Sequence, residues 1–215
     1  MLRNVPTYEL FTIIIVVSLL FITLAKALYP KRFNDFVSVV GNSKYLKIYV
    51  REQKFFDKFD ALLFVNLILS AAIFCFICFH YDSALLTPSS DDLFKLVVGI
   101  GIFVLIKVLL ERLIGSLFEI DKLIDAYLFQ KISYKNYLGL LLVPINVFLI
   151  FSFKPNLTII YIIIIILLII NVSGLFTTIK TNQSLIKQNL FYFILYLCAL
   201  EIAPYYFMYY WFTNK

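Results

Sequence analysis

The stretch LTIIYIIIIILLIINVSGLF, residues 157–176, decides the fold of this chain. It carries no charged residue, and its length matches the ~20 apolar residues that a helix needs to cross the hydrocarbon core of a bilayer. The whole chain shares this character, because 62% of its residues are hydrophobic and only 15% are charged. Soluble proteins are about 45–50% apolar. We therefore expect a membrane protein.

Five further windows resemble this stretch, so we predict an all-α, polytopic membrane protein with about six transmembrane helices in one integral membrane domain, residues 1–215. The predicted spans are residues 8–28, 61–79, 93–113, 137–153, 157–179 and 189–212. The fourth is the shortest, and Pro144 lies within it. A chain this short has no room for a separate soluble enzyme domain.

The basic residues indicate the orientation. Fifteen of the 19 Lys and Arg residues follow the first, third and fifth spans, counting span ends, and four lie on the other side. Because cytoplasmic loops are enriched in Lys and Arg, residues 29–60, 114–136 and 180–188 are predicted to be cytoplasmic and both termini periplasmic. The net charge of +6 then reports this bias, and we expect no nucleic-acid partner. The predicted location is a bacterial inner membrane.

Amphipathic helices are expected on the cytoplasmic face. Residues 107–131 keep a helical period beyond the third span, with an apolar arc and a polar arc. The polar arc includes Glu111, Arg112, Glu119 and Lys122. Such a helix either projects or bends at Gly115. Its mixed charges make a protein partner at least as suitable as membrane lipid.

The first cytoplasmic loop has two interpretations. Phe33 and Phe36 give residues 29–60 a short amphipathic pattern, and Arg51 and Glu52 follow it. The loop is either a pair of interfacial helices or a docking surface for a partner.

Glu201 lies near the middle of the predicted last span, three residues before Pro204. A carboxylate at that depth costs at least ~2.5–3.5 kcal/mol, so it should be protonated or paired. Lys107, Asn171 and Asn146 are the partners nearest in predicted depth. Three roles remain open: a pair that holds the bundle together, a contact with another subunit, or a proton or ion relay.

The sequence offers little sign of catalysis. Cys75, Cys78 and His80 form the one cluster that looks like a site, but a tetrahedral zinc site needs four ligands. No nucleophile elbow, zinc-protease motif or phosphate-binding glycine loop is found. We expect no enzyme activity, no catalytic residue, no cofactor and no metal.

Several motifs resemble one family. They are RFNDF at 32–36, Tyr45 with Arg51 and Glu52, IGSLF at 114–118, and FYFILYLCALEIAP at 191–204. Together they are similar to an uncharacterised family of Bacteroidota inner-membrane proteins, classified as a domain of unknown function. The resemblance implies an envelope location and brings no activity with it. Our leading hypothesis is a non-enzymatic subunit of a larger inner-membrane complex, such as a protein-export assembly. The alternative is a small ion- or proton-coupled transporter that uses Glu201.

Overall fold

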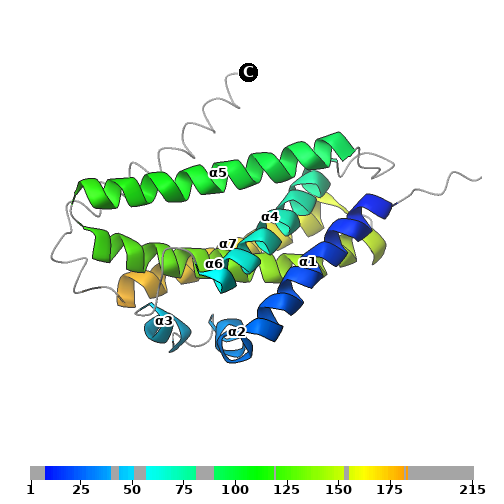
Figure 1. The fold of residues 1–215 in the computed structure, drawn as a ribbon. Coiled ribbons are helices and arrows are strands. Elements are labelled where there is room, and N and C mark those ends of the chain that lie inside the picture. Colours follow the sequence, from blue (N-terminus) through cyan, green and yellow to red (C-terminus); the bar gives the residue numbers. More distant parts are fainter. Residues whose placement is uncertain are drawn as a thin grey trace, which may run out of the picture.

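A computed structural model describes residues 8–39, 44–50, 57–80, 90–118, 120–152, 155–181 and 183. The elements in these ranges are helical: seven α-helices and one π-helical segment, with no strand among the described residues (Figure 1). The all-α prediction is therefore confirmed for this part of the chain.

Five helices are long and apolar enough to cross a membrane, which makes the chain a multi-pass membrane protein. They correspond to the first five predicted spans, and the sixth, residues 189–212, lies outside the described residues. Their bounds are α1 Glu9–Leu28, α4 Lys58–Phe79, α5 Ser90–Leu117, α6 Asp121–Val147 and α7 Leu157–Thr181. Two short helices, α2 Pro30–Val37 and α3 Lys44–Tyr49, lie between α1 and α4.

Local sequence signals place several helix starts. The carboxylate of Asp57 caps α4 by accepting a hydrogen bond from the Phe59 backbone N–H at 3.1 Å. Asp91 and Asp92 stand in the first turn of α5, where negative charge is favoured by the helix dipole. Pro30 begins α2, at a position where its missing N–H costs no hydrogen bond.

The fourth membrane helix starts much earlier than predicted. Residues 114–136 were predicted to be a cytoplasmic loop that keeps a helical period as far as residue 131, but α5 ends at Leu117 and the membrane helix α6 already begins at Asp121. The two helices form a hairpin whose direction reverses between Leu117 and Asp121, near Gly115, where a bend was one of the two alternatives expected. A Cβ at Gly115 would lie 2.9 Å from the Ile124 Cβ, so glycine is what allows the two helices to approach.

The far end of α6 is irregular. Pro144 lies inside α6, and the chain continues from Val147 directly into the π-helical segment η1, Phe148–Ser152. A proline cannot donate the backbone hydrogen bond that the α-helix requires, which fits a change of helix type at this point.

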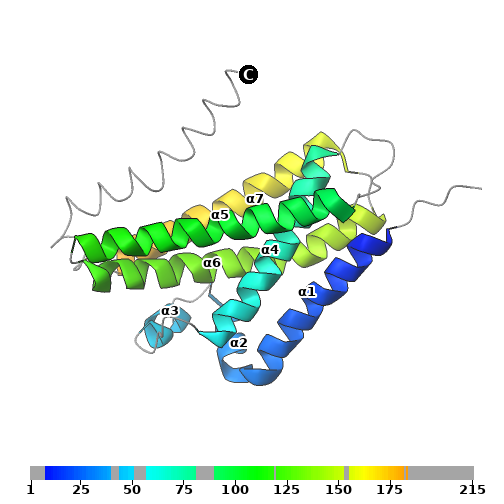
Figure 2. The ribbon, with the colours of Figure 1, turned by 45° about the horizontal axis from the view of Figure 1, so that its top comes forward.

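Helices α4 and α6 form the centre of the bundle. Figure 2 shows α4 crossing α6, with α1 and α5 beside α4 and α7 along α6, in agreement with the helix contacts. The backbones of α4 and α6 come close at Gly139, where a Cβ would lie 2.7 Å from the Leu67 Cα. A Cβ at Gly174 on α7 would similarly lie 2.6 Å from the Tyr134 ring. Small residues at such crossings are typical of membrane helices.

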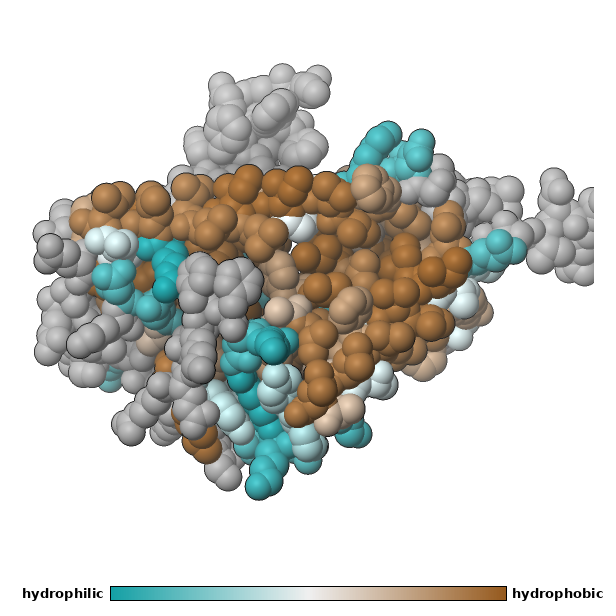
Figure 3. Space-filling view, viewed as in Figure 1, coloured by the Kyte–Doolittle hydropathy of each residue, from teal (hydrophilic) through white to brown (hydrophobic). Residues whose placement is uncertain are grey.

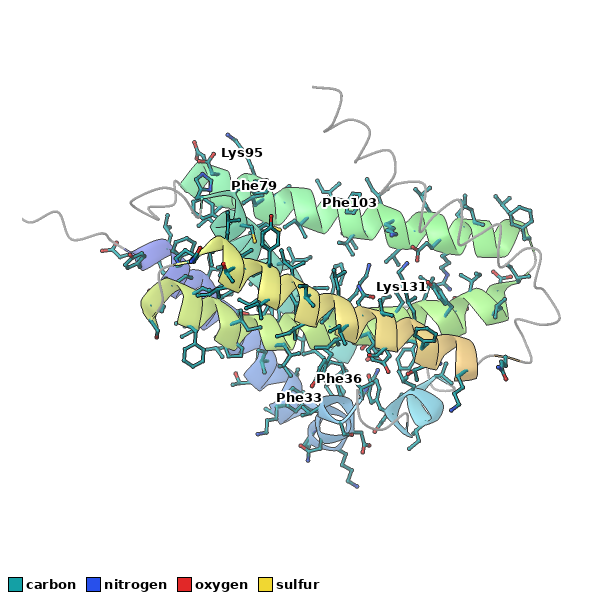
Figure 4. The ribbon with its side chains drawn as sticks, turned by 180° about the vertical axis from the view of Figure 1, so that it is seen from behind. Phe33, Phe36, Phe79, Lys95, Phe103 and Lys131 are labelled. Carbon is teal, nitrogen blue, oxygen red and sulfur yellow. The ribbon has the colours of Figure 1, made fainter. Side chains whose placement is uncertain are left out.

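The outer surface of the bundle is apolar. Figure 3 shows a broad hydrophobic face over the long helices, with hydrophilic residues gathered toward α2 and α3. Phe103 on α5 points away from the bundle in Figure 4. Several α7 side chains are exposed in the same way, namely Ile162, Ile165, Ile166, Leu168 and Ile169. An exposed surface of this composition suits lipid and is unusual for a soluble monomer.

Candidate functional site

Charged and polar residues gather at the end of the bundle that carries α2 and α3. Arg32 on α2 is the centre of one group there. Its guanidinium donates to the carboxylate of Asp57 and, at 3.1 Å, to that of Asp60. The rings of Tyr49 and Phe59 lie 5.0 and 4.7 Å from it. Arg32 thus ties α2 to the start of α4 through ion pairs and cation–π contacts.

Aromatic residues pack α2 and α3 onto the bundle. Phe36 is fully buried, with its ring 5.6 Å from Tyr45 and 5.7 Å from Phe59. Tyr45 also stacks on Phe129 of α6, at 5.8 Å. Burial raises the pKa of the Tyr45 hydroxyl above its usual value, which keeps it neutral. The predicted apolar side of this region, Phe33 and Phe36, therefore faces α4 and α6 (Figure 4).

A second group joins α5 to α6. The Lys131 ammonium of α6 donates to the Glu111 carboxylate of α5 at 2.5 Å. Glu111 has no exposed surface, and the Lys131 side chain is 9% exposed. Figure 4 shows Lys131 between the two helices. Asn136, one turn further along α6, donates to the backbone carbonyl of Asp60 at 3.3 Å. This contact places the two groups at a similar level of the bundle.

A third, uncharged group lies deeper among the spans. Ser18 of α1 donates to the Asn66 side chain of α4, and Ser70 donates to the Asn66 carbonyl at 2.5 Å. Asn146 of α6 donates to the Ser70 carbonyl at 2.8 Å. All four residues are buried. Such hydrogen bonds hold neighbouring helices together inside a membrane.

The intramembrane residues predicted from sequence lie in different places. Lys107 is buried on α5, close to the Glu111 group, and Asn146 belongs to the network just described. Asn171 is exposed on α7 and does not line the described interior. Glu201 and Pro204, the residues that these were expected to meet, lie outside the described residues.

The predicted cytoplasmic polar arc is wrong for Glu111, which is buried and paired. Arg112 is on the surface, where it meets Asp125 of α6 at 3.9 Å. The prediction failed because lipid replaces water around most of α5, so its apolar side faces outward and Glu111 faces inward. Arg51, Glu52 and Glu119 lie outside the described residues, and the Lys122 side chain is also not described.

The cysteine cluster has an ordinary environment. Cys75 and Cys78 are free and half-buried on α4. His80 stacks on Phe76 at 4.2 Å and lies beside the Phe76 carbonyl. Among the described residues, no group of three or more His, Cys, Asp or Glu side chains is placed to hold a metal ion.

Sequence reasoning missed Arg32 and Lys131 as site residues. Arg32 opens the RFNDF motif, which is a signal that could have identified it. Its partners Asp57 and Asp60 lie 25 and 28 residues away. Lys131 could have been found only with the position of the hairpin turn. The arrangement that results is a set of ion pairs that join neighbouring helices, which stabilises a helix bundle.

Comparison with known proteins identifies the family. A family model described as a domain of unknown function, DUF4271, matches residues 11–212, and the chain therefore belongs to that family. No curated protein matches the chain. No solved structure matches it either.

Proposed function

We propose that this protein is a non-enzymatic subunit of a larger assembly in the bacterial inner membrane, where it binds a protein partner through the tip of the α5–α6 hairpin. The end of the bundle that carries α2 and α3 is the cytoplasmic end, in keeping with the distribution of Lys and Arg. A protein-export machine is one assembly of this kind.

The observation that supports this proposal is the exposure of large apolar side chains at the hairpin tip. Leu113 and Leu117 of α5 are 57% and 70% exposed, and Phe118 follows at 39%. Leu117 lies six residues beyond Glu111, or about 9 Å along the helix. Glu111 is itself near the level at which α4 begins, so the tip extends past the charged groups of that end.

The surroundings of these side chains favour a protein over lipid. Arg112 and Asp125 lie on the same hairpin, and their opposite charges make a mixed polar surface. A helix that binds anionic lipid usually has a Lys/Arg-rich polar face instead. Apolar anchors surrounded by charges of both signs are typical of protein interfaces.

The inside of the hairpin is well suited to hold such a surface in place. Ile120, Leu123, Ile124, Tyr127 and Leu128 form a buried cluster of their own. On the side of this cluster away from the turn, the Glu111–Lys131 ion pair joins α5 to α6. The tip is therefore a packed unit that presents its leucines outward.

Site-specific photo-crosslinking in cells tests this proposal. A photoreactive amino acid at Leu117 should give a discrete protein adduct that mass spectrometry can identify. The matched control is the same substitution at Phe103, which is 50% exposed on the same helix but lies in the middle of the span. Discrete adducts from Phe103 and none from Leu117 would refute the hairpin interface.

A further inference from the structure

A small cleft lies between α4, α5 and α6, next to the Glu111–Lys131 ion pair. Its cavity volume is about 10 Å³, which is close to the room that a single buried water molecule needs. Apolar side chains from all three helices line it, among them Leu67, Val104 and Ile132. A cleft of this size admits water and excludes larger ligands.

Two residues that line the cleft each have one buried acceptor atom without a hydrogen-bond partner among the described residues. In Glu111 this atom is Oε2, because Oε1 accepts from Lys131. In Asn136 it is Oδ1, because Nδ2 donates to the Asp60 backbone carbonyl. The bond to a carbonyl also fixes which way the Asn136 amide is turned. Neither side chain has exposed surface, so bulk water does not reach these two atoms.

The chemistry of the two atoms limits what the cleft can bind. Both are acceptors, so their partner must be a donor, and an anion is not one. A metal cation is disfavoured because the positively charged side chains of Lys107, Lys131 and Lys135 line the same cleft. A water molecule carries two O–H donors, which matches two acceptors. Buried polar groups without a protein partner are commonly satisfied by such water molecules.

We propose that the cleft binds one water molecule, which donates one hydrogen bond to Oε2 of Glu111 and the other to Oδ1 of Asn136. The water completes a chain of hydrogen bonds that runs from Lys131 through Glu111 and Asn136 to the Asp60 carbonyl. This chain joins α5, α6 and α4, and it fixes the α5–α6 hairpin relative to α4. The proposal does not depend on a protein partner at the hairpin tip.

An experimental density map of the full chain, at a resolution that shows ordered water, tests the proposal directly. We expect a water peak in the cleft at about 2.5–3.0 Å from both acceptor atoms, the usual length of an O–H···O hydrogen bond. A cleft without a peak would overturn the proposal. So would a peak that contacts only one of the two acceptors, or a lysine ammonium that donates to both.

A double-mutant cycle tests the same bridge in detergent solution, with the folding equilibrium constant as the readout. Asn136→Ala is measured in the wild-type protein and in a background that carries Glu111→Leu and Lys131→Met. That background has no carboxylate at position 111 for the water to bridge. The loss caused by Asn136→Ala should therefore be about fivefold smaller there, since a hydrogen bond through water contributes about that much.

Asn146→Ala is the matched control for the cycle, because Asn146 is a buried asparagine of the same helix that donates to the Ser70 carbonyl in a separate network. Its effect should agree within about twofold between the two backgrounds, as for independent sites. If Asn136→Ala costs the same in both backgrounds, nothing links Asn136 to Glu111 and the proposal fails. A decrease of equal size at Asn136 and Asn146 would also count against it, since the link would then not be specific to Asn136.

Discussion

Replacing Glu111 by glutamine should destabilise the bundle strongly. The Glu111 side chain is fully buried, and its oxygen lies 2.5 Å from the Lys131 ammonium. The substitution removes this carboxylate from a place that Lys107, Lys131 and Lys135 also line. Breaking a buried ion pair in this way costs about 3–5 kcal/mol, because the ammonium group stays buried after its carboxylate is removed. Unfolding of the purified protein by dodecyl sulfate in neutral detergent measures the change in free energy.

Two controls make the experiment quantitative. Arg112→Gln removes a pair that is 3.9 Å apart and 41% and 48% exposed, so it should cost less than about 1 kcal/mol. Exchanging both Glu111 and Lys131 for leucine and methionine should recover most of the loss, since apolar side chains of similar size replace the pair. If Glu111→Gln costs no more than Arg112→Gln, the pair does not hold the hairpin closed and the reasoning is refuted.

Three other substitutions test the packing of the bundle by the same unfolding assay. Gly139→Ala should cost about 1–3 kcal/mol, because the added Cβ would lie 2.7 Å from the α4 backbone. Gly99→Ala should be neutral or stabilising, because a Cβ there would have no atom within 4 Å. Equal effects of the two substitutions would argue against the close crossing. Arg32→Lys should cost about 2 kcal/mol, because lysine cannot hold two carboxylates and two rings with a planar fork, and a neutral result would contradict the proposed role of α2. Asn146→Leu should cost only about 0.6 kcal/mol, the average for a hydrogen bond between membrane helices. A loss above about 3 kcal/mol would show that Asn146 stabilises the bundle by more than its hydrogen bond to Ser70.

The five apolar spans in the described part of the chain could be predicted from sequence because length and hydropathy alone define them. The stretch 157–176 is continuous enough to identify α7 without any knowledge of its neighbours. The start of α6 could not be found in this way, since residues 121–136 mix polar and apolar residues and resemble a loop or a surface helix. In the structure Gln130, Ser133 and Asn136 of this segment face the interior.

The buried charges were harder to predict for a related reason. Helical periodicity showed that Glu111 and Leu113 lie on opposite faces, but it could not show which face is outward. A soluble helix exposes its charges, whereas a membrane helix exposes its leucines. Pairing Glu111 with Lys131 also needs the reversal of the chain between α5 and α6, which a continuous helical period across 107–131 concealed.

The short helices illustrate the value of the motif that carried the resemblance. RFNDF supplies Arg32, Phe33 and Phe36, and these residues attach α2 to α4 and α6. The motif is thus accounted for by packing and ion pairing at this end of the bundle. Its partners Asp57 and Asp60 have no sequence pattern of their own, and the fold alone brings them to Arg32.

The most direct test of the central claim is the composition of the particle that this chain forms in its own membrane. The tagged full-length protein should be extracted in a mild detergent, purified gently, and analysed for its mass and for co-purifying proteins. We predict a stoichiometric set of other membrane proteins, lost when Leu113 and Leu117 are both changed to serine and retained when Phe103 is changed. A homogeneous monomer or homodimer without partners, from membranes in which the protein is functional, would contradict the claim.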